Sequence, residues 1–201
     1  MSPAAHETGG WLADARRVES PNHDRRSAAG VVDLLVIHYI SLPPGQFSGD
    51  AVERLFTNSL DHAAHPFFET LRGLRVSSHF LVRRRGELVQ FVDTCARAWH
   101  AGRSCFMGRE ACNDFSIGIE LEGSSEARFT DAQYLRLASL TRALCARHPL
   151  RWVAGHSDIA PGRKDDPGPL FDWSRYLSSI RDTGLVRPFG TAPDKAGGAC
   201  A

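Results

Sequence analysis

Two short apolar segments stand out along the chain because each of them ends in a histidine. The first is Leu34-Leu-Val-Ile-His38 and the second is Trp152-Val-Ala-Gly-His156. The first run is continuously apolar, which is typical of a strand buried on both faces of a sheet. The second has the length of a strand, and a loop rich in proline and glycine follows both. We predict two strands that each deliver a histidine to the rim of a sheet.

The spacing of apolar residues predicts the other elements. Ser78–Val82 and Glu87–Val92 flank an Arg-Arg-Gly turn, which predicts a hairpin. Residues 115–122 alternate apolar with small or acidic residues, as a half-buried strand does. Helical spacing predicts helices over 48–56, over 130–147 with Thr130 and Gln133 as a capping box, and after the capping residue Asp172. Residues 62–75 are interpreted as a mixed loop.

Strands and helices in this order predict one α/β domain, with a mixed β-sheet flanked by helices. A chain of 201 residues is long enough for one domain with a sizeable core. We place this domain at residues 11–182 and find no internal repeat. Residues 1–10 and 187–201 are small, polar and rich in glycine, alanine and proline, so we predict that they form flexible tails.

Composition narrows the classes of function. The formal net charge is +1 at pH 7, so the chain lacks the strongly basic balance of a nucleic-acid binder. No apolar run approaches the roughly 20 residues needed to span a bilayer. Residues 1–10 contain no apolar segment of the kind found in signal peptides. We expect a cytoplasmic protein that binds neither nucleic acid nor membrane.

The two histidines and the loop after His156 suggest a metal site. If their strands lie parallel and adjacent, both imidazoles reach the same edge of the sheet, where open α/β sheets place their sites. Prolines stiffen the loop after His156, and Asp166 lies in it ten residues beyond that histidine. Together with His38, this would be a set of two histidines and one carboxylate, with a position left open as in catalytic zinc sites. The alternative is that both histidines are core residues bonded to backbone groups.

Two further residue types have the chemistry of catalytic groups. Glu120 lies in an apolar strand, where partial desolvation would raise its pKa and suit it to act as a general base. Glu122 faces the same way, so spacing leaves the choice between them open. Only Lys164 and Lys195 of the 24 lysines and arginines are lysine. The compact ammonium of Lys164 would suit an oxyanion, although a strong arginine bias could also leave one lysine by chance.

Other residues are candidates for contact with a substrate. Trp99 lies in a loop where its ring could stack on a sugar, with core packing as the alternative. Arg75, at the end of the mixed loop, is the second candidate. His79 alternates with apolar residues of the hairpin, so we interpret it as packed or hydrogen-bonded, but it competes as a metal ligand. His100 has no comparable context.

Longer motifs resemble one protein family. They are similar to type 2 N-acetylmuramoyl-L-alanine amidases, and within that group to the cytoplasmic 1,6-anhydro-N-acetylmuramyl-L-alanine amidases. The resemblance runs from about Trp11 to Ile180. Its motifs include Val36-Ile-His38, Ala64-His-Pro-Phe-Phe68, Val76-Ser-Ser-His79, Arg97-Ala-Trp-His-Ala-Gly102, Cys112-Asn-Asp-Phe-Ser-Ile-Gly-Ile-Glu-Leu-Glu-Gly123 and Gly155-His-x-Asp-Ile-Ala-Pro-x-Arg-Lys-x-Asp-Pro-Gly-Pro169.

The resemblance implies the fold of that group, which peptidoglycan recognition proteins share, and one Zn²⁺ per chain. The family's metal ligands fall on His38, His156 and Asp166. Its acidic catalytic residue falls on Glu120 rather than Glu122, and its lysine on Lys164. The implied substrate is an anhydromuramyl peptide from peptidoglycan recycling. The implied reaction cleaves the amide bond between the lactyl group of the anhydromuramic acid and L-alanine.

Two positions depart from the family pattern. Tyr39 stands where relatives often carry asparagine, and Ala111 stands where they often carry arginine. Either change would alter how the stem peptide is bound.

We expect a monomeric zinc hydrolase. The alternatives are a muropeptide-binding module that does not cut, and a metal-free α/β domain. A binder can lose Asp166 or Lys164, whereas this chain keeps both.

Overall fold

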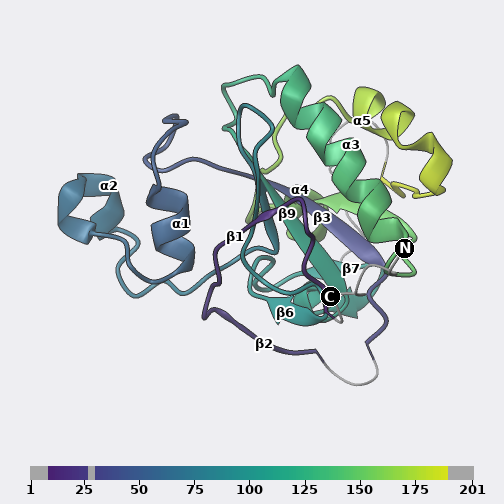
Figure 1. Cartoon of the computed structure of the whole chain (residues 1–201), viewed down its shortest axis with the longest axis horizontal. Coiled ribbons are helices and arrows are strands. Elements are labelled where there is room, and N and C mark those ends of the chain that lie inside the picture. The colour runs from purple at the N-terminus through teal and green to yellow at the C-terminus, as the bar shows by residue number, and fades with distance from the viewer. Residues whose placement is uncertain (1–8, 27–29, 190–201) are drawn as a thin grey trace, which may run out of the picture.

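Six strands form the central sheet of the computed structural model, which describes residues 9–26 and 30–189 (Figure 1). Their order is β1-β5-β4-β9-β3-β10. β4, β9, β3 and β10 run parallel, whereas β5 is antiparallel to β4, so the predicted mixed sheet is confirmed. The strands are β1 (Arg16–Arg17), β3 (Leu34–Ile40), β4 (Phe80–Val82), β5 (Leu88–Gln90), β9 (Ser116–Glu122) and β10 (Trp152–Gly155). Two small sheets pair β2 (His23–Arg25) with β6 (Ala96–Ala98) and β7 (Cys105–Phe106) with β8 (Arg109–Glu110).

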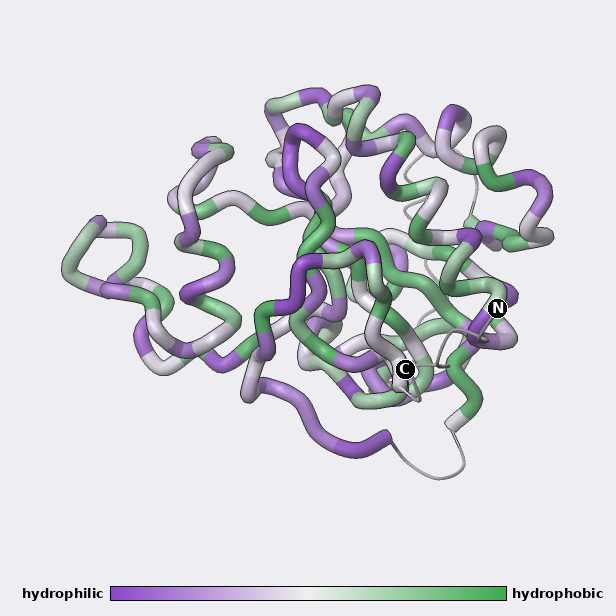
Figure 2. Tube along the Cα trace, in the orientation of Figure 1, coloured by the Kyte–Doolittle hydropathy of each residue, from purple (hydrophilic) through white to green (hydrophobic). Residues whose placement is uncertain are grey.

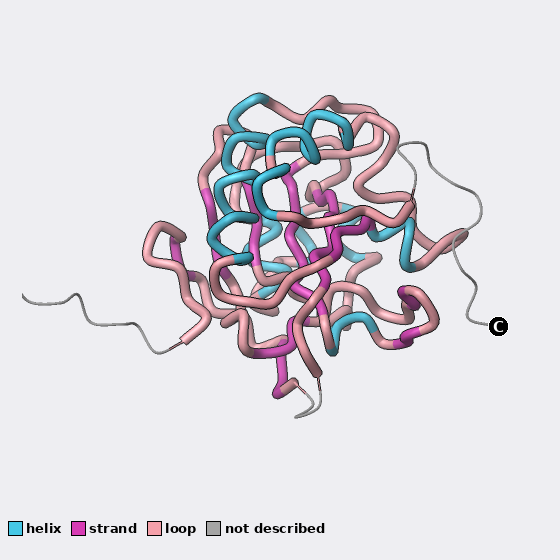
Figure 3. Tube along the Cα trace, turned by 90° about the vertical axis from the view of Figure 1, so that its right-hand side faces the viewer, coloured by secondary structure: helices cyan, strands magenta, loops and turns pink. Residues whose placement is uncertain are grey.

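Helices cover the two faces of the sheet unequally. The long helix α3 (Asp131–Cys145) and α5 (Trp173–Ser179) lie together on one side of the strands (Figures 1 and 3). The short helices α1 (Ala51–Phe56) and α2 (Pro66–Glu69) lie on the opposite flank of the molecule, and their buried residues share a cluster with Leu81 and Val89 of the sheet (Figure 1). The remaining helical turns are η1 (His62–Ala64), η2 (Cys112–Asp114), α4 (His156–Ile159) and η3 (Arg181–Thr183).

Both faces of β3 are buried, because successive side chains of a strand point to opposite faces of the sheet. Leu35 and Ile37 pack in the cluster that includes α3 and α5. Leu34 and Val36 belong to a separate cluster with Phe106. Hydrophobic residues accordingly follow the central strands in Figure 2. The prediction of a strand buried on both faces is confirmed. The side chain of His38 lies on the same face of the sheet as those of Leu34 and Val36.

β9 differs from the sequence-based prediction in its burial. All seven of its residues are buried, including Ser116, Glu120 and Glu122. The prediction of a half-buried strand is wrong because β9 lies between β3 and β4, and its polar face is covered by other parts of the chain. The ring of His100, for example, lies against Gly118 and Ser116.

The remaining elements follow the sequence closely, with one exception. The hairpin of β4 and β5 and the capping box of α3 are confirmed, and the Asp172 side chain caps α5. The mixed loop predicted at 62–75 instead contains η1 and α2. Two local caps stabilise these turns, since Asp61 accepts from the Ala63 N–H and His65 accepts from the Phe67 N–H.

The predicted tails fall mainly on residues 1–8 and 190–201, which lie outside the described residues. At the described ends, the Gly10 N–H donates to the Asp93 carboxylate at 2.9 and 3.0 Å. The Arg187 guanidinium pairs with the Asp158 carboxylate at 2.8 and 2.9 Å. Across the described residues, no helix combines the length and apolar character that crossing a membrane requires.

Candidate active site

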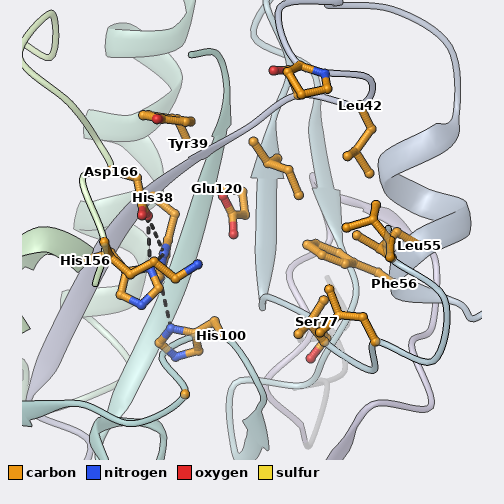
Figure 4. Close-up of a pocket in the computed structure, with 18 of the residues that line it drawn as sticks. His38, Tyr39, Leu42, Leu55, Phe56, Ser77, His100, Glu120, His156 and Asp166 are labelled. Carbon is orange, nitrogen blue, oxygen red and sulfur yellow. Dashed lines mark hydrogen bonds and ion pairs between the residues drawn. The ribbon is translucent and has the colours of Figure 1, made fainter. Parts of the chain in front are cut away.

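His38 and His156 meet because their strands are adjacent and parallel. Gly155, the last residue of β10, pairs with Ile37 of β3. The next residue on each strand is a histidine, so the two imidazoles leave the sheet at the same level. Their rings lie edge to face with centroids 4.4 Å apart (Figure 4). The condition for the predicted site, that the two strands lie parallel and adjacent, is therefore met.

Asp166 reaches the two histidines because its loop folds back onto the end of β10. A Cβ atom on Gly155 would lie 2.7 Å from Cδ of Pro167, so this close approach requires glycine. The Ser157 N–H also donates to the Asp166 carbonyl oxygen at 2.8 Å. These two contacts hold the carboxylate beside His156 (Figure 4).

The three side chains present a compact triangle of donor atoms. Nδ1 of His38 lies 3.0 Å from Nδ1 of His156 and 2.9 Å from Oδ2 of Asp166. The third side, from Nδ1 of His156 to Oδ2 of Asp166, is 3.0 Å. All three residues are buried, and they form a group that could hold a metal ion. Atoms this close together can share one ion at the bond lengths of about 2.0–2.2 Å that zinc makes.

The protonation of His156 fits a metal ligand. Its Nε2 lies 3.1 Å from the Ala101 carbonyl oxygen, and a carbonyl can only accept, so Nε2 carries the proton. Nδ1 of a neutral ring then has a bare lone pair, which points at His38 and Asp166. Burial and the neighbouring His156 lower the pKa of His38 to about 4, so this ring is neutral at pH 7. Two imidazole nitrogens and a carboxylate oxygen are a donor set that suits zinc.

Glu120 lies directly across from His38 in the β3–β9 register, and on the same face of the sheet. It is buried, and its Oε2 atom has no hydrogen-bond partner among the described residues. Burial and the nearby Asp166 carboxylate raise the pKa of Glu120 well above its ordinary value, while the charge of Lys164 opposes this rise. Its side chain points into the cavity beside the histidines (Figure 4).

Glu122 points to the same face of the sheet but is fully engaged. Its Oε1 accepts from Nη1 of Arg83 at 3.3 Å, and its Oε2 accepts from the Arg84 N–H at 3.0 Å. Its carboxylate is therefore bound to two residues of the loop between β4 and β5. The structure distinguishes the two carboxylates that strand spacing could not separate.

The triangle and Glu120 open into one cavity of about 760 Å³. One wall is apolar and comes from the loop after β3 and from the region of α1 and α2; it comprises Leu42, Leu55, Phe56, Phe67, Leu71 and Val76. The other wall carries polar and charged groups. Lys164, Trp99 and Arg75 all line the cavity, as a substrate-contacting role for them requires. Their roles remain predictions.

Two other histidines, His79 and His100, were candidates or neighbours of the site without being part of the triangle. His79 accepts the Gly118 N–H on its Nδ1 at 3.0 Å, so it is a hydrogen-bonded sheet residue and lies outside the metal-binding group of the described residues. His100, which had no distinguishing sequence context, lies with its Nδ1 3.0 Å from Nε2 of His38. Burial, together with the neighbouring His38, lowers the pKa of His100 well below its ordinary value. No periodic pattern marks His100, and the glycine that makes room for its ring, Gly118, lies on a different segment of the chain.

The two departures from the family pattern occupy different places. The Tyr39 hydroxyl donates to Oδ2 of Asp165 at 3.0 Å, and Tyr39 lines the cavity. Burial and Asp165 raise the pKa of this phenol to about 12. Ala111 has a left-handed backbone (φ +56°) at the start of η2 and does not line the cavity. Tyr39 is therefore the departure that can touch a ligand.

Comparison with known proteins agrees with the motifs. The model of the N-acetylmuramoyl-L-alanine amidase family matches residues 27–169. The chain is 56% identical over 169 residues to the 1,6-anhydro-N-acetylmuramyl-L-alanine amidase AmpD of Escherichia coli (strain K12). That match covers 83% of this chain and 92% of the relative.

Solved structures give the same result. A crystal structure of a selenomethionine derivative of AmpD is similar with a TM-score of 0.82 and 53% identity, over 86% of this chain and 97% of that one. The amidase AmiD of E. coli, in complex with its substrate anhydro-N-acetylmuramic acid-L-Ala-D-γ-Glu-L-Lys, is similar with a TM-score of 0.54 and 32% identity. That match covers 80% of this chain and 61% of AmiD.

The raised pKa of Glu120 predicts how stability depends on pH in the metal-free protein. Between the unfolded pKa near 4.5 and the higher folded pKa, the folded chain binds more protons, so stability falls as pH rises. Glu120→Gln removes this titration. We expect the variant to gain stability over the parent as pH rises from about 4 to about 7. Urea unfolding with a chelator present measures the difference.

Glu122→Gln is the matched control for this measurement. It removes a carboxylate that is paired with Arg83 and the Arg84 N–H, so we expect it to destabilise the protein at neutral pH. A Glu120→Gln protein that is less stable than the parent at neutral pH would contradict the assignment.

Proposed function

The chain belongs to the N-acetylmuramoyl-L-alanine amidase family, and we propose that it is a zinc-dependent amidase of peptidoglycan recycling. In this proposal it hydrolyses the amide bond between the lactyl group of 1,6-anhydro-N-acetylmuramic acid and L-alanine. The observation that carries the proposal is the buried triangle of His38, His156 and Asp166 beside Glu120, whose Oε2 has no hydrogen-bond partner in the described part of the chain. The names of AmpD and of the AmiD complex support the choice of substrate.

His38, His156 and Asp166 would hold the metal, and all three residues line the cavity. Zinc in such a site supplies Lewis acidity, which polarises a carbonyl group and lowers the pKa of a coordinated water to about 7. The protein contributes buried ligands, and this burial keeps the His38 imidazole neutral.

Glu120 is placed to move the proton. Glu120 lines the cavity, and its Oε2 has no hydrogen-bond partner among the described residues, so the carboxylate can accept a proton from the attacking water. The raised pKa makes the carboxylate a stronger base, so it can hold the proton after the attack and then pass it to the more basic leaving amine of L-alanine. One buried carboxyl group thereby serves both halves of the hydrolysis.

Lys164 is placed to stabilise the charge that develops on the carbonyl oxygen. It lines the cavity two residues before Asp166, and its charge acts on both Glu120 and His38. A compact ammonium with three donors can follow the oxygen as the carbonyl becomes tetrahedral. Its contribution would therefore be made in the transition state.

Trp99, Arg75 and the apolar wall are the proposed substrate contacts. The indole of Trp99 offers a face on which a sugar can stack, and Arg75 offers a cation for a carboxylate. All proposed ligands and catalytic groups come from one chain, which supports action as a monomer. We also propose a cytoplasmic location, and this rests on the family resemblance alone.

The metal site is tested by removing one ligand. We expect His38→Ala to lose both zinc and activity, whereas His23→Ala, an exposed histidine on β2, should keep both. Zinc content by atomic emission, together with mass spectrometry of digested anhydromuramyl tripeptide, reads out the result. The parent should release the anhydrosugar and a peptide that begins with L-alanine. Intact substrate with measurable binding would show a recognition module instead.

Removal of the proton carrier should separate metal binding from turnover. We expect Glu120→Gln to keep zinc and lose about 10²–10⁴-fold in kcat, the usual contribution of a general acid–base group. Glu122→Gln should reduce kcat far less, because Glu122 is paired with the hairpin. Steady-state kinetics on the same anhydromuramyl tripeptide measure kcat for both variants. Near-normal turnover in Glu120→Gln would contradict the role.

Substitution of Lys164 tests whether the cavity needs a compact ammonium. We expect Lys164→Arg to keep zinc and fold but to lose at least about tenfold in kcat, because the planar guanidinium presents its charge differently. KM should change little, since the contact is made in the transition state. A variant with the parent's kcat would show that any positive charge suffices. If Lys164→Ala kept the parent's kcat, Lys164 would have no role in catalysis.

A further inference from the structure

The chain of contacts that begins at His38 continues well beyond the metal triangle. Nε2 of His38 lies 3.0 Å from Nδ1 of His100 (Figure 4). Nε2 of His100 lies 3.2 Å from Oγ of Ser116. Oγ of Ser116 in turn lies 2.6 Å from the carbonyl oxygen of Cys112. Four groups thus form one continuous line, in which every side chain is buried.

The direction of each hydrogen bond in this line is fixed by its last member. A carbonyl oxygen only accepts, so the Ser116 hydroxyl donates its single proton to Cys112. The Ser116 oxygen must then accept from Nε2–H of His100. Because a neutral imidazole carries one N–H, Nδ1 of His100 is bare and accepts from Nε2–H of His38. Nδ1 of His38 is therefore left bare, and it is the atom in the metal triangle.

The loop that carries His100 also serves the second histidine ligand. The Ala101 carbonyl accepts from Nε2–H of His156, as described above. The N–H groups of His100 and Ala101 both donate to Oδ1 of Asn113, at 3.2 and 2.8 Å. Two consecutive residues therefore supply the outer partner of both imidazoles, and one asparagine side chain holds these two residues.

The ring of His100 packs directly against the sheet. A Cβ atom on Gly118 of β9 would lie 2.4 Å from Cγ of His100, so the ring lies directly on the strand. Its edge also meets His79, with ring centroids 5.7 Å apart. The ring is therefore held in one orientation, with Nδ1 toward His38 and Nε2 toward Ser116.

We propose that His100 is a positioning residue which, through Ser116 and the Cys112 carbonyl, holds His38 in the Nε2–H tautomer and so presents its bare Nδ1 to the metal. This inference rests on the proposed zinc function. It gives a role to a buried histidine that lies against one of the three proposed ligands without being one of them. Hydrogen-bond partners of this kind typically change metal affinity by about 10–100-fold.

The tautomers can be observed directly in the metal-free parent protein. Long-range ¹H–¹⁵N correlation spectra distinguish protonated from bare ring nitrogens. We expect His38, His100 and His156 all to carry their proton on Nε2. A proton on Nδ1 of His38 or of His100 would overturn the relay, whether or not the protein binds zinc.

Variants of His100 test whether its acceptor atom controls zinc affinity. Asparagine can place its amide oxygen near the position of Nδ1, whereas leucine fills similar space without an acceptor. We expect His100→Leu to bind zinc about 10–100-fold more weakly than the parent, and His100→Asn to recover at least about tenfold of that loss. Competition with a chromogenic chelator gives the affinities, and circular dichroism checks the fold.

Ser116→Ala removes the next member of the relay without touching either ring. We expect weaker zinc binding and a mixture of His100 tautomers in the spectra. Ser78→Ala is the matched control, because Ser78 is buried but its hydroxyl has no partner among the described residues.

The outcomes separate the two proposals. A parent that does not bind zinc would contradict the proposed function, while the tautomer spectra would still decide the relay. A parent that binds zinc while His100→Leu and His100→Asn bind it equally well, or equally poorly, would overturn the positioning role.

Discussion

The parallel register of β3 with its two neighbours is the constraint on which the rest of the structure depends. β3 pairs with β10 on one side and with β9 on the other, and both pairings end at the same edge of the sheet. His38, His156 and Glu120 therefore arrive at one level from three different segments of the chain. A shift of one residue in either pairing would turn the shifted side chains to the opposite face, into the core under α3. The apolar residues on both faces of β3 hold the register in place.

Burial shifts the pKa values of the groups in the site. It also carries a free-energy cost for each polar atom that lacks a hydrogen-bond partner. The interior disfavours charge, so the His38 imidazole stays neutral and the Glu120 carboxyl resists ionisation. Each buried polar atom then needs a partner, and most of the groups around the histidines find one in the loop at His100 and Ala101. Oε2 of Glu120 has no partner among the described residues, and an unpaired buried atom on a residue that lines a cavity is the kind of local violation expected at a functional site.

The contrast between Glu120 and Glu122 shows how neighbours assign different tasks to identical side chains. Both lie on one strand, two residues apart, and both face the same side of the sheet. An arginine and a backbone N–H hold one of them, whereas the other faces histidines and open space. Only the latter is free to exchange a proton.

The sequence alone was sufficient for features that depend on local pattern. The apolar runs at 34–38 and 152–155, the hairpin and the capping box of α3 each follow from spacing over a few residues, and all are present in the structure. Parallel adjacency of the two histidine strands was a conditional inference from their similar ends, and the structure meets the condition.

Tertiary structure decided whatever depends on neighbours distant in the sequence. The full burial of β9, the pairing of Glu122 with Arg83 and the helical turns within 62–75 could not be predicted from spacing. His100 is the clearest case. Nothing in its local sequence distinguishes it, and its relation to His38 exists only because Gly118 leaves room for its ring on the strand beside β3. Hydrogen-bond direction is a property of the assembled network, so only the fold could determine which nitrogen of His38 faces the site.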